Sequence, residues 1–251
     1  MINFRVEYYT DPLCCWSWGM EPQMRKLRYL LRDRLQIEYV MGGLISDWKH
    51  FSDQLNDISS PSQVGPLWME AKHMTGQPMD EFLWVKDPVD TTYPACMAVK
   101  AAELQSAIAG EAMLRKLREA VMLQQKNIGN KEVILEVASG LADKDILDLA
   151  TFERVWMSQQ AADLFRKDLE KIKIKGITRF PTLLIYTNDR SLQVTGYRPF
   201  KVLLDAFKNL DPDLRLNEEV DEKTYRKSWA HLTERELEEI KAEKTESAAI
   251  K

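Results

Sequence analysis

Strand-like sequence lies near the two ends of this chain, with a long stretch of other character between them. At the start, apolar and polar residues alternate from Ile2 to Tyr8, and Ile37–Met41 forms a second apolar run that stops at Gly42. Strand character returns at Leu183–Tyr186 and, after a turn, at residues 192–194. Short strands need neighbours for their backbone hydrogen bonds, so the two pairs must meet in one sheet. The sequence therefore predicts an α/β fold whose sheet is interrupted by an inserted helical segment.

Helical signals fill the stretch between these strands. A helical period of apolar residues after residue 20 predicts a helix that ends near Arg34. Ser60-Pro61-Ser62-Gln63 has the form of a capping box with proline at the first helical position. Further helices are predicted from Pro94, over Glu111–Gln125, Lys131–Ala142 and Met157–Lys173, and over Phe200–Phe207.

These elements predict a chain divided into four parts. Residues 1–58 and 157–210 form the two halves of the sheet-containing domain, and residues 59–156 form an all-helical insertion domain. Residues 211–251 form a charged tail, in which a capping box at Thr233–Glu236 predicts a short helix.

Composition excludes several classes of function. The net charge of −4 argues against nucleic acid as a partner, and no apolar run approaches the length of a membrane span. The three histidines are scattered, which predicts no metal site. Three cysteines, two of them adjacent, make a poor disulfide framework, and no leader sequence follows Met1, so we expect a cytoplasmic protein.

The stretch Tyr9–Pro22, YTDPLCCWSWGMEP, places a thiol where the first strand gives way to a helix. Unpaired N–H groups and the positive end of the helix dipole favour an anion at such a junction. The pKa of the Cys14 thiol is therefore expected to fall toward neutrality, which would make it a nucleophile.

Four motifs in this order resemble the DsbA-like branch of the thioredoxin fold, and within it the FrnE-type oxidoreductases. They are Asp11–Gly19, Tyr93–Cys96, Phe180–Thr182 and Gly196-Tyr197, and the likeness covers roughly residues 1–210. The resemblance implies a thiol–disulfide oxidoreductase or isomerase. It assigns Cys14 and Ser17 to the catalytic site, a cis proline at Pro181 opposite the thiol, and substrate contacts to Trp16, Trp18, Phe180 and Pro181.

The chain departs from this resemblance at Ser17, which stands where such enzymes usually carry a resolving cysteine. A hydroxyl can hydrogen-bond a thiolate but cannot attack sulfur, so an external thiol such as glutathione would complete the cycle. Cys15 is a poor substitute, because adjacent Cα atoms lie about 3.8 Å apart, too close for an unstrained disulfide. Cys96 is a second auxiliary thiol, although a lone cysteine on an apolar helical face is more often part of the core.

Two other classes of function stay open. Kappa-class glutathione transferases and chromene-carboxylate isomerases share the inserted helices and match Ser17-Trp18, but Tyr197-Arg198 replaces the pair that holds glutathione there. The third class is a non-catalytic adaptor, because one DsbA-like subfamily presents substrates to a cytosolic protease. A cluster of Met and Trp residues around Trp68 and Met74 could pack the core or bind apolar peptides. We expect protein or small-molecule thiols and disulfides as partners, no bound cofactor, and leave a homodimer open.

Overall fold

A computed structural model describes residues 3–216 and 221–248, and its centre is a four-stranded mixed sheet. The strands are β1 (Phe4–Thr10), β2 (Leu35–Met41), β3 (Thr182–Tyr186) and β4 (Ser191–Thr195). Their order in the sheet is β2-β1-β3-β4, with β1 parallel to β2 and antiparallel to β3, and with β3 antiparallel to β4. The early and late strands therefore meet as the sequence predicts, along the β1–β3 pair.

Helices occupy most of the remaining described chain. Around the sheet they are α1 (Cys15–Gly19), α2 (Glu21–Leu31), α9 (Gln159–Lys175) and α10 (Phe200–Leu210). Between β2 and α9 they are α3 (Val64–Thr75), α4 (Leu83–Lys86), α5 (Tyr93–Glu103), α6 (Ala107–Gln124), α7 (Lys131–Ala142) and α8 (Leu149–Trp156). At the end they are α11 (Glu222–Lys227) and α12 (Glu234–Ala248). Short 3-10 turns occupy Arg32–Arg34 and Pro61–Gln63.

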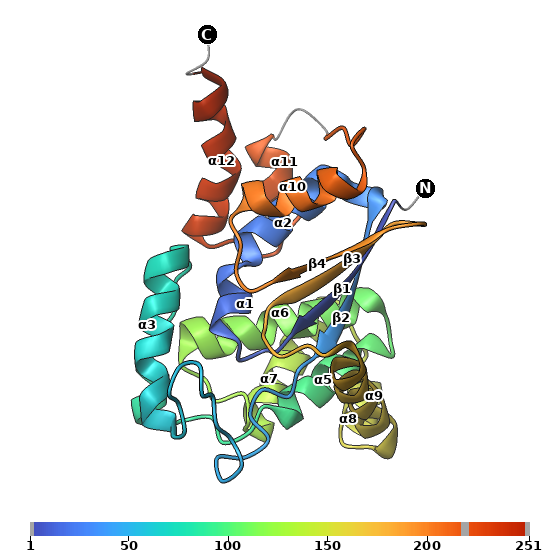
Figure 1. The fold of residues 1–251 in the computed structure, drawn as a ribbon. Coiled ribbons are helices and arrows are strands. Elements are labelled where there is room, and N and C mark those ends of the chain that lie inside the picture. The colour runs from blue at the N-terminus through green and yellow to red at the C-terminus, as the bar shows by residue number, and fades with distance from the viewer. Residues whose placement is uncertain (1–2, 217–220, 249–251) are drawn as a thin grey trace.

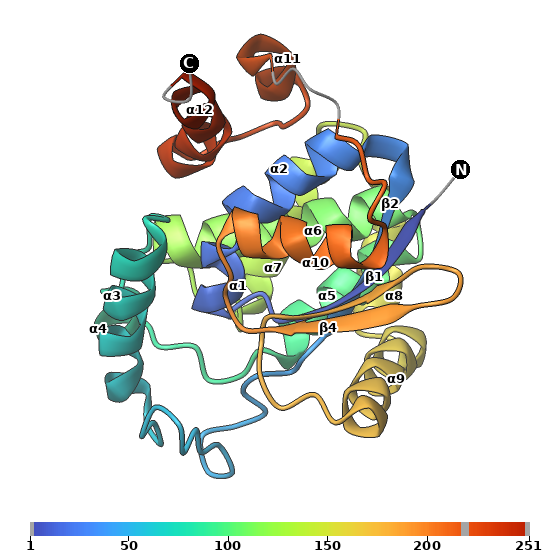
Figure 2. The ribbon, with the colours of Figure 1, turned by 45° about the horizontal axis from the view of Figure 1, so that its top comes forward.

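The sheet lies between two layers of helices (Figures 1 and 2). On one face, Phe4, Val6 and Tyr8 of β1 pack with Leu27 of α2 and Phe207 of α10. On the other face a smaller apolar cluster joins the sheet to the region of α9. β1 is a central strand and, apart from the exposed Arg5, it is buried on both faces, so the alternation of polar and apolar residues marks a solvent-facing side only at Arg5. The predicted thioredoxin-like fold with a helical insertion is confirmed.

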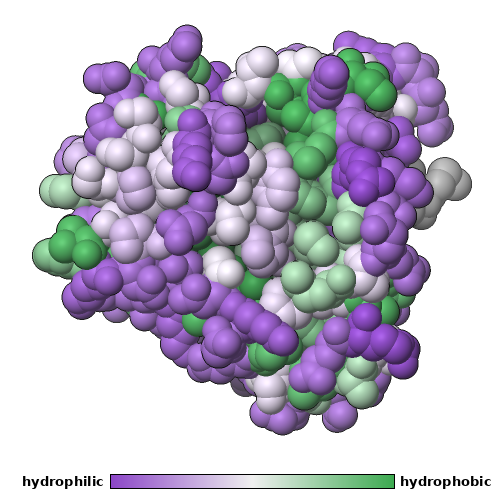
Figure 3. Space-filling model, turned by 90° about the horizontal axis from the view of Figure 1, so that it is seen from below, coloured by the Kyte–Doolittle hydropathy of each residue, from purple (hydrophilic) through white to green (hydrophobic). Residues whose placement is uncertain are grey.

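The inserted helices have a core of their own, which includes Cys96 and many alanines. α5 lies at its centre and contacts α6, α8 and α9. Gly110 lets α6 approach the end of α5 closely, because a Cβ added at Gly110 would lie 2.9 Å from the Cβ of Glu103. No described helix has both the length and the apolar character needed to cross a bilayer. The face seen in Figure 3 is mostly hydrophilic, with apolar side chains gathered in a band between polar borders.

Two helix predictions need correction. The predicted helix from residue 20 to Arg34 is α2, which ends in a 3-10 turn at Arg32–Arg34, and the separate short helix α1 before it was missed. The predicted helix over Met157–Lys173 is α9, and the separate helix α8 before it was missed. α8 begins because Asp148 caps it, accepting a hydrogen bond from Thr151 N at 2.8 Å.

The tail was predicted to contain one short helix, which is wrong because it contains both α11 and α12. The predicted capping box is present: Thr233 N–H donates to the Glu236 carboxylate at 2.8 Å, and Glu236 N–H donates to Thr233 Oγ1 at 3.2 Å. The second of these helices, α12, is longer than the short helix predicted from the sequence, because contacts with α2 stabilise it. Figure 1 shows α12 above α3, with α2 beside its lower part.

Truncating Phe207 tests the packing between the sheet and α10. Phe207 is fully buried and meets Phe4 edge to face at 4.9 Å between ring centroids. We expect Phe207→Ala to lower the free energy of unfolding by about 3–5 kcal/mol, measured by urea denaturation. The half-exposed Val202 lies on the same helix, and Val202→Ala should cost less than about 1 kcal/mol. Equal losses for the two variants would contradict this packing.

Candidate active site

Cys14 forms the N-cap of α1 at the point where β1 has ended. Its backbone is extended, with φ −70° and ψ 106°, and its Sγ accepts a hydrogen bond from Ser17 N–H at 3.4 Å. Its own N–H donates to Asp11 O at 3.1 Å, which closes the turn between strand and helix. The sequence therefore located the thiol correctly at a strand-to-helix junction.

A buried carboxylate holds this junction in place. Asp11 Oδ1 accepts from Leu13 N at 2.9 Å, and Oδ2 accepts from Leu44 N at 2.8 Å. From α5 and the residue that precedes it, Thr92 Oγ1 and Cys96 Sγ also donate to Oδ2, at 3.1 and 3.3 Å. Burial raises the pKa of Asp11, and these donors oppose that rise. Asp11 thus connects the junction to the segment after β2 and to the inserted helices.

Burial also raises the pKa of the Cys14 thiol, which is only 5% exposed. Ser17 opposes the rise through its side chain and its N–H, Asp11 adds to the rise, and the guanidinium of Arg118 lowers the pKa. The expectation of a lowered pKa is therefore wrong in direction, because desolvation outweighs the hydrogen bonds and charges that favour the thiolate. The Ser17 hydroxyl is buried without a hydrogen-bond partner among the described residues, so it is free to donate to a charged sulfur.

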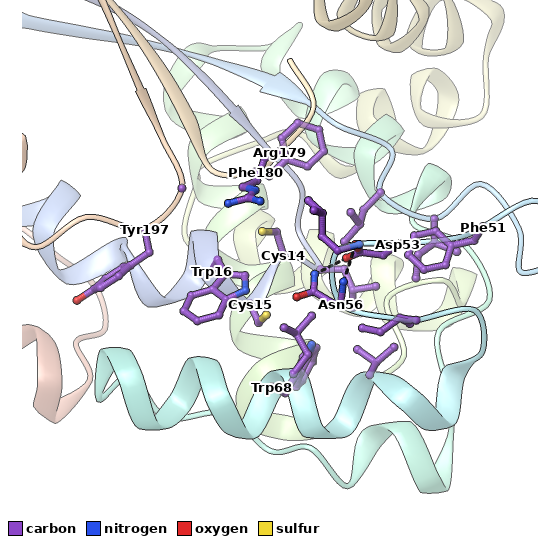
Figure 4. Close-up of a pocket in the computed structure, with 18 of the residues that line it drawn as sticks. Cys14, Cys15, Trp16, Phe51, Asp53, Asn56, Trp68, Arg179, Phe180 and Tyr197 are labelled. Atoms are coloured by element: carbon purple, nitrogen blue, oxygen red, sulfur yellow. Dashed lines mark hydrogen bonds between the residues drawn. The ribbon is translucent and has the colours of Figure 1, made fainter. Parts of the chain in front are cut away.

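A cavity of about 710 Å³ opens beside Cys14. Figure 4 shows Cys14 between Trp16 and the segment that carries Arg179 and Phe180, with Trp68 of α3 across from them. The remaining wall comes from three places: residues 51–58 after β2, the arm formed by α3, and residues 196–198 after β4. The cavity lies where the sheet-containing part meets the helical part, and its lining combines apolar side chains with two arginines, Arg179 and Arg198.

Phe180 and Pro181 lie on the far side of the cavity from α3. The Phe180–Pro181 peptide bond is cis, and Pro181 O accepts Gly196 N–H at 2.7 Å. Phe180 lines the cavity, whereas Pro181 is buried and contributes no lining surface. The Phe180 ring rests on Gly42, where an added Cβ would lie 2.3 Å from the ring. Gly42 is therefore required for the position of Phe180.

The two tryptophans of the motif have different places. Trp16 lines the cavity and lies 6.4 Å from the ring of Tyr197. Trp18 was assigned to substrate contacts, but it is fully buried and its indole N–H donates to Pro78 O at 2.8 Å. Its ring also supports the guanidinium of Arg115, 4.5 Å from the ring centroid. Trp18 is thus a core residue beneath the site, because α1 turns successive side chains to different sides.

All three cysteines are free thiols. Cys15 is buried at the wall of the cavity, and Cys96 is buried beneath Asp11. Burial raises the pKa of both thiols well above the usual range. Cys96 packs in the core, as its position on an apolar helical face indicated, and its hydrogen bond to Asp11 turns its sulfur to that carboxylate. Within the described residues no group of three or more His, Cys, Asp or Glu side chains could hold a metal ion.

Sequence reasoning missed Asp11 and Arg118 as parts of the site. Asp11 entered the sequence analysis only as the first residue of the motif Asp11–Gly19, and the residues around it in the sequence do not indicate the four donors that surround its carboxylate. Arg118 comes from α6, far along the chain, and its Nη2 donates to Thr10 Oγ1 at 2.5 Å. Arg118 is one of several charged residues in the predicted helix Glu111–Gln125, so its residue type and position are too common a signal to identify a site.

The comparisons with known proteins fit this geometry. Residues 8–205 match the family described as thioredoxin. The chain belongs to the thioredoxin family. The match ends before the tail, so α11 and α12 lie outside it.

Some of the similar proteins are named as adapters and others as enzymes. The "ClpXP adapter protein SpxH" of Halalkalibacterium halodurans is 27% identical over 210 residues, which are 82% of this chain and 67% of that protein. The cytosolic disulfide reductase DsbM from Pseudomonas aeruginosa, also solved with GSH, is 20% identical, with a TM-score of 0.64 over 82% of this chain and 99% of that one. A 2-hydroxychromene-2-carboxylate isomerase is 14% identical, with a TM-score of 0.55 over 82% and 95% of the two chains. Both structural likenesses concern the fold.

The raised pKa of Cys14 predicts a pH profile for its alkylation. In a Cys15→Ala/Cys96→Ala background, we expect the alkylation rate to be low at pH 7 and to keep rising above about pH 8.5, where an ordinary thiol is half ionised. Mass spectrometry of iodoacetamide-treated protein measures the rate at each pH. Ser17→Ala removes a group that favours the thiolate and should move the midpoint still higher. A midpoint near or below pH 7 would contradict the dominance of burial.

Proposed function

We propose that this chain carries out thiol–disulfide exchange, with Cys14 as its attacking thiol and without an internal resolving cysteine. The observation that carries the proposal is the position of Cys14 at the head of α1. There its sulfur accepts the Ser17 N–H, borders a large cavity, and faces the segment that holds Phe180. The names of structurally similar proteins such as DsbM support the same chemistry.

The reaction is a monothiol cycle. The Cys14 thiolate attacks one sulfur of a substrate disulfide, a mixed disulfide forms, and the other substrate sulfur leaves as a thiolate. An external thiolate then attacks the Cys14 sulfur, which releases the second substrate sulfur as a thiolate and leaves Cys14 joined to the external thiol. A second external thiolate attacks the external sulfur of this disulfide, which frees Cys14 as a thiolate and leaves the two external thiols joined as a disulfide. Glutathione is the external thiol we propose, and the reducing cytoplasm is the compartment that would supply it.

Ser17 limits this cycle to an external thiol. Its hydroxyl can donate to the Cys14 thiolate, which stabilises the attacking and leaving form, but it cannot displace the substrate. The buried thiols Cys15 and Cys96 offer no replacement, because burial keeps both protonated near neutral pH. A mixed disulfide should therefore last until glutathione resolves it.

Two substitutions test the cycle with a fluorescent peptide disulfide and varied glutathione. Cys14→Ala should abolish exchange, whereas Cys15→Ala should retain most of it. Ser17→Cys places a second thiol at the resolving position, so peptide release should become independent of glutathione concentration. If Cys14→Ala keeps the wild-type rate, the proposal is lost.

A second candidate function is that of a protein-binding adaptor. The observation in its favour is the name of the sequence relatives, together with the apolar side chains on the α3 side of the cavity. Leu55 and Met74 border this cavity and are 71% and 60% exposed, so a partner could cover them without any thiol chemistry.

The adaptor hypothesis predicts binding that does not need Cys14. A permanently unfolded, carboxymethylated protein has no free thiol and serves as the probe in fluorescence anisotropy. Under this hypothesis Cys14→Ala should bind the probe as well as wild type does, and Leu55→Asp/Met74→Asp should weaken binding about ten-fold or more. An exposed pair away from the cavity, Val85→Asp/Ile174→Asp, is the matched control. Absence of saturable binding by wild type would remove this candidate.

A further inference from the structure

A chain of buried charges runs from the C-terminal helix to the underside of the active site. It begins at Glu236 of α12, whose side chain is fully buried. The Glu236 carboxylate accepts from Arg115 Nη1 at 2.6 Å and from Nη2 at 3.2 Å, and Arg25 Nη1 lies 3.3 Å from it. Arg115 belongs to α6 and Arg25 to α2, so this carboxylate joins the helical insertion to the sheet-containing part.

The chain continues from Arg115 toward the thiol. Arg115 Nη1 lies 3.5 Å from Glu21 Oε1, and the other oxygen of Glu21 accepts from Arg118 Nη1 at 2.9 Å. Arg118 then reaches Thr10, the last residue of β1, with its Nη2. Signs alternate along this path, and each member is held by the one before it. Its side chains are at most 14% exposed, so water screens these charges weakly.

We propose that Glu236 is a positioning residue for Cys14: through Arg115 and Glu21 it fixes the location of the Arg118 guanidinium relative to the thiol. The inference deepens the proposed function, since it rests on Cys14 being the reactive thiol and concerns how that thiol is controlled. It assigns a role to a segment outside the residues that match the thioredoxin family.

The residues next to Glu236 in the sequence fix its position through hydrogen bonds to the end of α3. Thr233 Oγ1 donates to Gln77 Oε1 at 2.8 Å, and Arg235 Nε donates to Thr75 O at 3.0 Å. Both contacts hold the end of α3, whose other residues form a wall of the cavity. The C-terminal helix thus contacts both the arm that shapes the cavity and the charges that lie below Cys14.

Other groups also act on the thiol, and the test must separate them. Asp11 and Tyr8 face it from β1 and the turn that follows, Ser17 and Cys15 come from α1, and Arg118 comes from α6. Across the cavity the charged lining residues are Arg179, Arg198 and Asp53. Cys15 is replaced by alanine in every protein compared below, and none of the other residues named here is changed.

The direction of the effect follows from the alternating signs. Without the Glu236 charge, Arg115 interacts more strongly with Glu21. Glu21 then attracts Arg118 less strongly, so the Arg118 guanidinium can stabilise a thiolate at Cys14 more effectively. Loss of one negative charge also favours the thiolate directly. Glu236→Gln should therefore ease the ionisation of Cys14.

The experiment is the pH profile of Cys14 alkylation in full-length protein that carries Cys15→Ala and Cys96→Ala. We expect Glu236→Gln to raise the rate about three-fold at pH values below the midpoint, which corresponds to a midpoint about half a pH unit lower. The limiting rate at high pH should stay unchanged. The matched control is Glu239→Gln, one turn further along α12, which removes the same charge from contacts with Lys26 and Arg235. It should leave the midpoint in place.

A second control separates the effect of the lost charge from the effect of weaker packing at the start of α12. Thr233→Val removes both the hydrogen bond to Gln77 and the one that Thr233 Oγ1 accepts from Glu236 N–H, but it keeps every charge, so it should not move the midpoint. The proposal is overturned if Glu236→Gln and Glu239→Gln have the same midpoint of Cys14 alkylation. It is also overturned if Glu236→Gln changes only the limiting rate, which reports how accessible the thiol is to the reagent. If circular dichroism shows that Glu236→Gln is unfolded, Glu21→Gln tests the same chain and should also lower the midpoint. Because titration does not require turnover, a failed exchange assay and a failed shift are separate results.

Discussion

The Asp11 carboxylate is the interaction on which the site depends. A single buried side chain receives hydrogen bonds from the turn before Cys14, from the segment after β2, and from Thr92 and Cys96 at the start of α5. These segments belong to different parts of the fold, so Asp11 fixes the inserted helices against the sheet directly below the thiol. A buried carboxylate without such donors would cost several kcal/mol, which is why the contacts are numerous.

The same burial determines the chemistry of Cys14. A helix N-terminus favours a thiolate, and Ser17 and Arg118 act in the same direction. Desolvation and the nearby Asp11 act against it and prevail, so the thiol is held protonated until its surroundings change. In this state the site holds its thiol in the protonated form, which is the less nucleophilic one. A substrate in the cavity, or a shift of the charges below it, would alter the balance between these opposing effects.

Those charges also explain why the tail is part of the folded body. The tail is acidic, yet its decisive residue, Glu236, is buried between two arginines from two other helices. Removing one partner would leave an uncompensated buried charge, and such losses cost about 3–5 kcal/mol. The C-terminal helix is therefore bound to the rest of the protein by ion pairs. The preceding helix α11 packs through Tyr225, whose ring meets Tyr29 of α2 edge to face.

The sequence by itself determined the order of the strands along the chain, the site of the insertion and the placement of Cys14 at a strand-to-helix junction, because alternation, caps and turns are local. It also located the Thr233 capping box. The placement of Phe180 beside the site came from the resemblance to DsbA-like proteins. Only the tertiary structure decided that Trp18 is buried, that Asp11 and Arg118 adjoin the thiol, and that burial raises the pKa of Cys14. Those properties depend on side chains more than a hundred residues away, such as Arg118 and Glu236. Burial and charge proximity are set by the whole packed molecule, and no local pattern encodes them.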